Sequence, residues 1–363
     1  MTRMDMNLVR LHGWVAMTPL LLGAITPDTA AAHTRHPATH PAATALSVMA
    51  YNVKGLPWPI TSDRTADFRR IEARLRAMRA QHAQPHVIIL QEAFTSPAKA
   101  IARRSGYRYI VEGPSRDLQS PILARASDRA FIEGASFFKG ERSGKQVGSG
   151  LILASDYPIL SVHREAFPAF ACAGYDCLAN KGILMVTVKV PGSATPVTVV
   201  TTHMNSKRSS GVSQSRSLLA YRRQVEVIDD FIARYRNPDL PVILAGDFNA
   251  SSAERRSFLT AHSAAKWTTK RRLPIDNALQ HCLKSDAPCG RAVPAIAATV
   301  FQKGRDWQFF SAGYRASIQA IAMAVPFGRE HDGTMLSDHV GYRVTYRLTQ
   351  ALVPRTPRRR AIT

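Results

Sequence analysis

The chain has 363 residues, of which 45% are hydrophobic and 20% charged. This balance is that of a globular protein with a sizeable core, and it excludes a fibre or a fully disordered chain. Lysine and arginine outnumber aspartate and glutamate by 48 to 26, which gives a net charge of +22. Such a charge favours anionic partners such as nucleic acid, phosphorylated small molecules or anionic membranes, without choosing among them.

The first 32 residues have the pattern of a secretory signal peptide. Two basic residues, Arg3 and Arg10, precede a mostly apolar run over residues 11–25, and small residues follow up to Ala32. This order is typical of signal peptides, and the run is shorter than the roughly 20 apolar residues that a bilayer needs. We therefore expect cleavage near Ala32, a secreted or periplasmic protein, and no transmembrane segment in the mature chain.

Two further stretches lack the periodicity of helices and strands. Residues 33–45 are rich in histidine and proline, which predicts a flexible linker. Residues 351–363 include the sequence PRRR and predict a basic, disordered tail. We expect the intervening residues, 46–350, to form one catalytic domain.

The four cysteines form two close pairs along the chain. Cys172 lies near Cys177, and Cys282 lies near Cys289. An even number of cysteines in an exported protein favours disulfide bonds. Three pairings are possible, and the simplest joins each cysteine to its near neighbour. A zinc site is the weaker alternative, because neither pair has the CxxC spacing.

From residue 46 onward, apolar runs at the spacing of strands and helices alternate. They predict helices at 67–79, 215–235 and 253–261, and strands at 46–51, 87–90, 149–154, 182–190, 197–201, 242–244, 307–310 and 340–348. Many short strands with few helices indicate stacked sheets flanked by helices, an α+β or α/β sandwich. Residues 120–145 and 264–299 are expected to form long surface loops, where substrate-recognition elements are common.

Polar residues directly follow the apolar strands, or open the last one in the case of Asp338 and His339, where side chains from neighbouring strands converge at one end of a sheet. These residues are Asn52, Glu92, His203, Asn205, Asp247, Asn249, Asp338 and His339. Singly, each has a structural explanation such as capping a turn. Together they supply oxygen ligands for Mg²⁺, a base for water and donors for a phosphate.

This ordered set resembles the motifs of the endonuclease/exonuclease/phosphatase superfamily. The matching segments are Tyr51-Asn52, Gln91-Glu92, Thr202-His203-Met204-Asn205, Gly246-Asp247-Phe248-Asn249 and Ser337-Asp338-His339. Asp306 resembles the aspartate that orients the catalytic histidine in that superfamily. The resemblance covers residues 46–348 and implies a DNase I-like fold, a four-layered sandwich of two mixed β-sheets flanked by helices.

The resemblance and the chemistry together imply roles for these residues. Glu92, Asn52 and Asp338 are expected to bind Mg²⁺, with Mn²⁺ or Co²⁺ as possible replacements. His339 is expected to take a proton from the attacking water while Asp306 orients it. The remaining expected catalytic residues are Asp247 and Asn249 at the nucleophile or leaving oxygen and His203 at the phosphate, with Asn205 binding substrate.

Secondary features resemble the sphingomyelinase branch of the superfamily. Residues 52–57 (NVKGLP) are similar to that branch's Asn-Val-x-Gly-Leu-Pro opening. The segment from Asp176 to Gly182 is similar to its Asp-x-x-x-x-Lys-Gly segment, which implies that Lys181 and Asp176 serve substrate binding. The implied substrate is a phosphodiester in a membrane phospholipid, contacted peripherally, with sphingomyelin cleaved to ceramide and phosphocholine.

An extracellular endonuclease is the alternative, because phosphate contacts dominate nucleic-acid affinity and the chain is strongly basic.

The last motif departs from the pattern of the superfamily. After Asp338-His339 the chain reads Val-Gly-Tyr, where much of the superfamily has Pro-Val, so the entry to the last strand is expected to pack differently. The sequence leaves the oligomeric state open.

Overall fold

The computed structural model describes residues 44–266, 274–284 and 286–350. The predicted signal peptide and tail, and all but the last two residues of the predicted linker, lie outside these residues. Strand β1 begins at Thr44, so the folded part starts two residues earlier than predicted. No helix within the described residues is long and apolar enough to cross a membrane.

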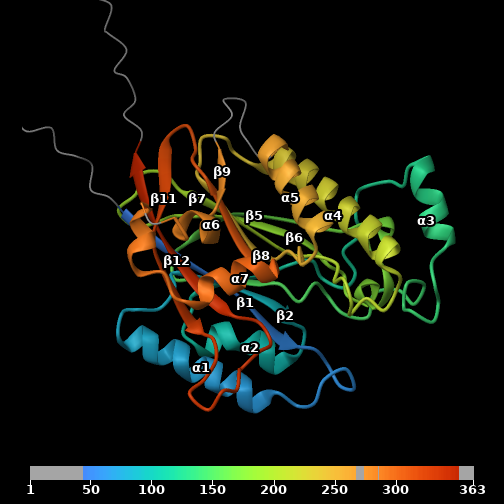
Figure 1. The fold of residues 1–363 in the computed structure, drawn as a ribbon, viewed down its shortest axis with the longest axis horizontal. Helices are drawn as coiled ribbons and strands as arrows, with labels where there is room; N and C mark the ends of the chain where they lie inside the picture. Colours follow the sequence, from blue (N-terminus) through green and yellow to red (C-terminus); the bar gives the residue numbers. More distant parts are fainter. Residues whose placement is uncertain (1–43, 267–273, 285, 351–363) are drawn as a thin grey trace, which may run out of the picture. The chain divides into compact units, whose positions relative to one another are not determined.

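Two six-stranded mixed sheets form the centre of the fold (Figure 1), which confirms the predicted fold class. The first has the order β11-β12-β1-β2-β4-β3 and the second β5-β6-β7-β8-β10-β9. Within each sheet one central pair is parallel, β1 with β2 and β7 with β8, and the other pairs are antiparallel. The strands of the first sheet are β1 (Thr44–Gly55), β2 (Val87–Ala93), β3 (Tyr109–Glu112), β4 (Ile152–Ser155), β11 (Ala316–Phe327) and β12 (Gly341–Gln350). Those of the second are β5 (Ile159–Ala166), β6 (Gly182–Val188), β7 (Val197–His203), β8 (Val242–Asp247), β9 (Ile275–Asn277) and β10 (Asp306–Ser311).

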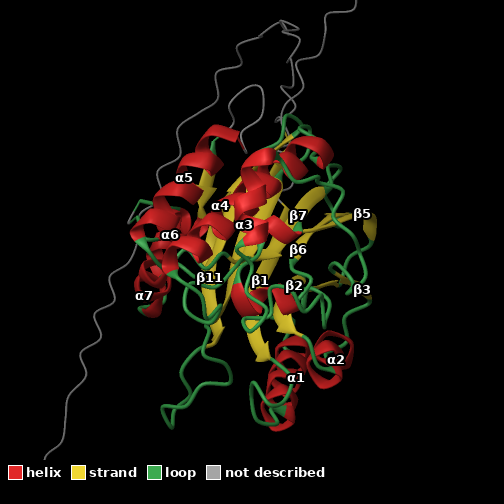
Figure 2. Cartoon of the chain, turned by 90° about the vertical axis from the view of Figure 1, so that its right-hand side faces the viewer, coloured by secondary structure: helices red, strands yellow, loops and turns green. Residues whose placement is uncertain are grey.

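Helices cover the two sheets on opposite sides (Figures 1 and 2). Figure 1 shows α1 and α2 below the strands and α4 and α5 above them. The α-helices are α1 (Thr65–Ala80), α2 (Ser96–Arg104), α3 (Arg129–Glu133), α4 (Gln214–Tyr235), α5 (Ala253–Lys266), α6 (Ala278–Cys282) and α7 (Ile296–Lys303). Four short 3-10 helices lie in the connections, η1 (Ala126–Asp128), η2 (Ala169–Ala171), η3 (Gly174–Leu178) and η4 (Pro288–Ala292).

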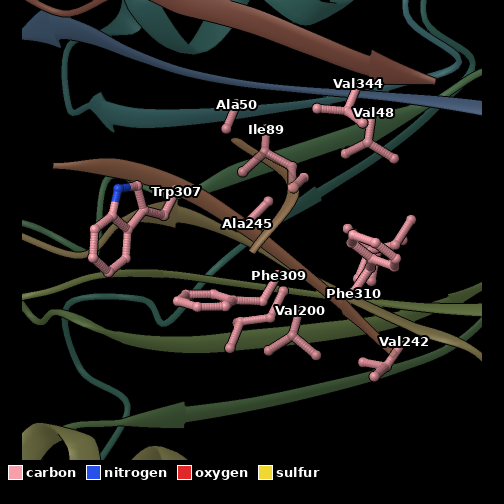
Figure 3. Packing of buried hydrophobic residues seen from close by; sticks show 14 of the residues in the cluster. Val48, Ala50, Ile89, Val200, Val242, Ala245, Trp307, Phe309, Phe310 and Val344 are labelled. Carbon is pink, nitrogen blue, oxygen red and sulfur yellow. The ribbon is translucent and has the colours of Figure 1, made fainter. Parts of the chain in front are cut away.

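The alternation of side chains along β1 explains the layering. Val48 and Ala50 face the core between the sheets, whereas Met49 and Tyr51 face the cluster under α1 and α2. Successive residues of a strand point to opposite faces, and both faces of β1 are covered, so the strand is almost continuously apolar. Figure 3 shows Val48 and Ala50 in the same buried cluster as Ala245 and Phe309 of the second sheet.

The prediction of one long loop over residues 264–299 is wrong. Where the structure describes it, this region contains β9, α6, η4 and the start of α7, and Leu279 and Ala297 are buried. Helices of five to eight residues have only one or two turns, too few for the helical spacing of apolar residues to be recognised in the sequence. The region 120–145 is mainly loop, as predicted, apart from η1 and the five-residue α3.

Both disulfide bonds predicted from the local spacing are present, Cys172–Cys177 and Cys282–Cys289. The first encloses a turn that contains Asp176. The second joins the end of α6 to η4. Because each bond closes a short loop, each cross-links its own neighbourhood rather than distant parts of the fold.

Candidate active site

Strand register brings three of the candidate residues together across the second sheet. His203 of β7 pairs with Asp247 of β8, and Asp247 pairs in turn with Asp306 of β10. Directly paired residues project from the same face of a sheet. The side chains of His203, Asp247 and Asp306 therefore form one row at the end of the sheet, with Asp247 in the centre.

The first sheet contributes Asn52 and Glu92 from the neighbouring strands β1 and β2. Strict alternation would turn Glu92 to the face of Ile88 and Leu90, which pack under the helices. Glu92 instead has a left-handed backbone, with φ of 55°, which is uncommon outside glycine. This conformation breaks the alternation at the strand end, and the Glu92 carboxylate meets the Asn52 side chain.

Asn52 joins the carboxylates of the two sheets. Its Nδ2 donates to Glu92 Oε1 at 2.9 Å and to Asp247 Oδ2 at 3.1 Å, while its Oδ1 accepts from the backbone of Lys54. His203 Nε2 lies 3.5 Å from Asp247 Oδ2 and 3.9 Å from Glu92 Oε1. One amide thus holds two negative groups from sequence positions 155 residues apart within reach of the same histidine.

His339 reaches the cluster from the turn before β12. Its Nδ1 lies 3.0 and 2.8 Å from the two carboxylate oxygens of Asp306, and its Nε2 lies 3.8 Å from Asp247 Oδ2. Ser337 fixes this turn, because its hydroxyl donates to the Asn52 carbonyl and accepts from the His339 amide. The turn is therefore anchored to β1, the strand that carries Asn52.

Burial and charge set the protonation of this cluster. Burial raises the pKa of Glu92 and lowers the pKa of His203 to about 3, so His203 is neutral at pH 7. For His339, burial disfavours the charge, but Asp306 and Asp247 outweigh it and raise the pKa to about 10. Burial also opposes ionisation of Asp247, yet the charge of His339 keeps the pKa of that carboxyl below its ordinary value.

Lys181 and Asp176 form a buried ion pair beside this cluster. The Lys181 ammonium donates to Asp176 Oδ1 and to the Met204 carbonyl, and it lies 3.3 Å from His203 Nε2. Burial alone would raise the pKa of Asp176, but Lys181 and the hydrogen bonds from Ser206 hold it below its ordinary value. The structure thus brings the Asp-x-x-x-x-Lys-Gly segment against the strand-end residues.

Three other candidate residues have their side chains directed elsewhere. Asn205 is fully buried, accepts from the Ala173 amide and donates to the Ser206 carbonyl. The Asn249 side chain donates to the Met204 carbonyl. Asp338 is half exposed and faces Lys54 Nζ at 3.6 Å. The roles assigned to these three residues from sequence remain predictions.

Sequence reasoning missed Ser206, which holds Asp176 in place. The Ser206 amide and hydroxyl both donate to Asp176 Oδ2, at 2.9 and 2.6 Å. A serine one residue past the Thr-His-Met-Asn motif is common in loops, so its type alone carried no signal. Its position directly after a candidate motif was the only available clue.

The donor atoms suit a divalent cation. Ligand atoms of Glu92, His203 and Asp247 lie within 4.8 Å of one another, and a second such group joins Asp247 to Asp306 and His339. The partly buried carboxylate of Glu92 and the buried carboxylate of Asp247 converge on one point, and such a pair suits the oxygen-rich sites that Mg²⁺ prefers. The clearest oxygen donors are Glu92 and Asp247.

Several solved structures have the same fold. The chain is similar to sphingomyelinase C from Streptomyces griseocarneus, at 20% identity and a TM-score of 0.51, over 83% of this chain and 99% of that one. It is similar to beta toxin from Staphylococcus aureus, at 16% identity and a TM-score of 0.52, over 82% and 99% of the two chains. It is also similar to TDP2 of D. rerio in complex with a single-strand DNA product, at 17% identity and a TM-score of 0.51, over 83% and 98%. At these identities the likeness concerns the fold alone.

No functionally curated protein matches the sequence significantly. The model of the Endonuclease/Exonuclease/phosphatase family matches residues 49–339. This range includes every candidate residue from Asn52 to His339. The chain belongs to the endonuclease/exonuclease/phosphatase family.

Proposed function

We propose that this chain is a secreted, Mg²⁺-dependent phosphodiesterase that hydrolyses sphingomyelin to ceramide and phosphocholine. The observation that carries this proposal is the position of Lys181, whose ammonium lies 3.3 Å from His203 and is paired with Asp176. A lysine in this position adds a positive charge for a substrate phosphate next to the carboxylate cluster. A purely structural ion pair is the alternative explanation.

In the proposed reaction, water adds to the phosphorus atom and the bond to the ceramide oxygen breaks. Glu92, oriented by the Asn52 side chain, would hold Mg²⁺, and the bound ion would supply charge neutralisation at the phosphoryl oxygens. Asp247 would orient the attacking water, and His339 in its neutral form would accept its proton at Nε2. Asp306 and Asp247 raise the pKa of His339 to about 10 against the effect of burial, and a divalent cation beside Asp247 would lower that pKa and favour the neutral imidazole. Asp306 would keep the imidazole oriented through Nδ1. The ceramide oxygen leaves with a proton, and the hydroxyl remains on phosphocholine.

His203 and Lys181 would act on the phosphate rather than on the proton. With a pKa of about 3, His203 is neutral in the working pH range and contributes as a hydrogen-bonding group. The cation beside it is Lys181, which the Asp176 carboxylate and the Met204 carbonyl hold in a fixed direction. Prearranged donors of this kind stabilise developing negative charge without reorganisation.

Exposed aromatic residues near η3, the short helix that carries Asp176, support a lipid substrate. Phe137 and Phe138 are 64% and 87% exposed, next to Lys139 and the exposed Arg142. Their segment is attached to η3, because Gln146 N donates to the Leu178 carbonyl. Exposed aromatic rings among cations suit the interface of a membrane.

A nucleic-acid phosphodiester is the second candidate, favoured by the net charge of +22. Cations alone provide non-specific affinity for nucleic acid. We rank it second because the segment from Asp176 to Gly182 resembles the sphingomyelinase branch.

The test offers the purified protein sphingomyelin vesicles, phosphatidylcholine vesicles and plasmid DNA, each with Mg²⁺ and with EDTA. We expect Mg²⁺-dependent release of phosphocholine from sphingomyelin. Nicking of the plasmid with no phosphocholine release would overturn the lipid assignment and favour the nuclease.

A substitution of the ion pair makes this test specific. The double variant Lys181→Met/Asp176→Asn removes both charges, so neither is left buried without a partner. We expect its activity on sphingomyelin to fall about 100-fold, the scale of losing one preorganised donor. Lys99→Met is the control, because Lys99 pairs with Glu112 on the surface. Equal activity of the two variants would contradict the role of Lys181.

A further inference from the structure

Arg255, in the first turn of α5, carries its guanidinium into the protein interior. The residue is 1% exposed, although arginine is almost never fully buried unless it is paired. Within the described residues no carboxylate lies at ion-pairing distance from it. Its partners are backbone carbonyls, one serine hydroxyl, and the ring of Tyr221, whose centroid lies 4.5 Å from the guanidinium carbon.

The two terminal nitrogens of Arg255 connect three segments of the chain. Nη1 donates to the carbonyls of Asn205 and Asn249, at 2.6 and 3.1 Å. Nη2 donates to the Ser206 carbonyl at 3.3 Å, and to the carbonyl and hydroxyl of Ser217 at 3.2 and 2.8 Å. One side chain thus joins the loop after β7, the loop after β8 and helix α4.

Residues of these loops form hydrogen bonds with the carboxylates of the candidate site. The backbone carbonyl of Asn249 accepts a hydrogen bond from Arg255, and the backbone N–H of Asn249 donates to Asp247 Oδ1 at 3.0 Å. Asn249 has a left-handed backbone, with φ of 48°, a conformation that asparagine adopts more readily than most residues and that local restraints hold in one geometry. The Arg255 bond to the Asn249 carbonyl is such a restraint.

The second loop leads from Arg255 to the lysine of the site. Ser206 accepts from Arg255 through its carbonyl, and its amide and hydroxyl donate to Asp176 Oδ2. Asp176 in turn binds Lys181. Arg255 is therefore linked through a single residue to Asp247 and through two residues to Lys181.

Only arginine can make this set of contacts. Its planar guanidinium has five donors in a fixed fork, whereas a lysine ammonium has three donors at one point. Because the contacts go to carbonyls rather than to a carboxylate, the positive charge is not cancelled by a partner. It remains beneath the site, where burial lowers the pKa of Arg255 although Tyr221, Asp176 and Asp247 oppose this shift.

We propose that Arg255 is a positioning residue for catalysis, which sets the loops after β7 and β8 so that Asp247 and Lys181 face the same substrate phosphate. This inference rests on the proposed phosphodiesterase function. A displacement of about 1 Å in such a group reduces turnover by about 100-fold. Arg255 does not touch the substrate, so its loss lowers kcat while KM changes little.

The test compares Arg255→Met with Arg343→Met. Arg343 is also partly buried, and burial lowers its pKa as well, but it donates to the Ala83 carbonyl, outside both loops. The substrate is bis(p-nitrophenyl) phosphate with saturating Mg²⁺, which requires neither a lipid nor a nucleic acid. Hydrogen exchange is measured in parallel on peptides covering residues 203–210 and 247–252.

We expect Arg255→Met to lose about 100-fold in kcat below its melting temperature and to exchange faster in both peptides. Arg343→Met should keep kcat within about threefold and exchange as the wild type does in these peptides. A folded Arg255→Met protein with wild-type exchange in both loops, or with wild-type kcat, would overturn the proposal.

Arg255→Lys keeps the inference testable if the methionine variant does not fold. It retains the charge and loses the fork, so we expect faster exchange in both peptides and at least about a tenfold loss of kcat. Wild-type exchange in this variant would also overturn the proposal. If the wild-type protein cleaves no diester, the proposed function fails, while the exchange measurements still decide whether Arg255 holds the loops.

Discussion

His339 directs Nδ1 to both carboxylate oxygens of Asp306, at 3.0 and 2.8 Å. Asp306 begins β10 and is held in register with Asp247, whereas His339 precedes β12 in the other sheet. The pair therefore connects the ends of the two sheets. This contact fixes the ring so that Nε2 faces Asp247, the residue proposed to orient the water.

Asp306→Asn should reduce kcat without unfolding the protein. The amide keeps the shape of the carboxylate but loses the charge that favours the imidazolium formed during proton transfer. We expect a loss of about 100-fold or more in kcat, the scale of general acid–base catalysis, with KM nearly unchanged. Asp239→Asn is the control, because Asp239 forms a surface pair with Arg315. The measurement is kcat for a phosphodiester substrate under steady-state conditions. A wild-type kcat in Asp306→Asn would contradict the proposed role of the Asp306–His339 pair.

The stability of the metal-free protein should depend on pH through His339. Its pKa is raised to about 10 by Asp306 and Asp247, against the effect of burial, whereas an unfolded histidine has a pKa of about 6.5. The folded state therefore binds the extra proton between these values. The resulting stability is fully present below about pH 6.5 and is lost as the pH rises through about 10. Melting temperatures of the wild type and His339→Gln over this range should diverge at low pH and converge at high pH, and parallel curves would contradict the assignment.

The sequence predicted that the residues of this site lie close together because the signal was local. His203 and Asp247 each follow a short apolar run typical of a buried strand, and parallel strands end at one edge of a sheet. The resemblance to the family added Asp306, which lies in register with Asp247 and contacts His339. Strands β1, β2, β7 and β8, which carry most of the site, were predicted to within a few residues.

Other parts of the fold carried no readable pattern. Arg255 binds backbone carbonyls. Every residue has a backbone carbonyl, so the residue types in the sequence do not indicate which residues Arg255 contacts. The left-handed turn at Glu92 depends on the packing of two sheets rather than on residue type. Edge strands such as β3 and β5 were missed because they are short or half exposed, and α6 has only five residues.

Removing each disulfide should affect stability similarly but activity differently. The loops closed by Cys172–Cys177 and Cys282–Cys289 span five and seven residues, and the chain-entropy model gives about 2 kcal/mol for each. Only the first encloses Asp176, the partner of Lys181. The variant Cys172→Ser/Cys177→Ser should therefore lose turnover as well as melting temperature. Its matched control, Cys282→Ser/Cys289→Ser, should lose melting temperature alone, and equal turnover in both would show that the first disulfide does not support the site.

Phe137 and Phe138 should matter only when the substrate lies in a membrane. Replacing both with serine removes exposed rings that pack edge-to-face on each other, and it leaves the carboxylate cluster untouched. We expect the rate on sphingomyelin vesicles to fall about tenfold or more, which corresponds to the loss of roughly 1.4 kcal/mol of interfacial binding. The rate on bis(p-nitrophenyl) phosphate should not change. Leu160→Ser on β5 is the control, because Leu160 is also exposed. A vesicle rate equal to that of the control would exclude this segment from membrane contact.

Metal dependence at Glu92 tests the central claim most directly. The rate of phosphodiester cleavage is measured against Mg²⁺ concentration for the wild type and for Glu92→Gln, after both proteins have been treated with EDTA. Because the Glu92 carboxylate is the proposed metal ligand, the wild type should be inactive without Mg²⁺ and saturate as it is added. Glu92→Gln should require more Mg²⁺ and reach a rate at least about 100-fold lower. Full activity of the EDTA-treated wild type, or identical Mg²⁺ curves for the two proteins, would contradict the account.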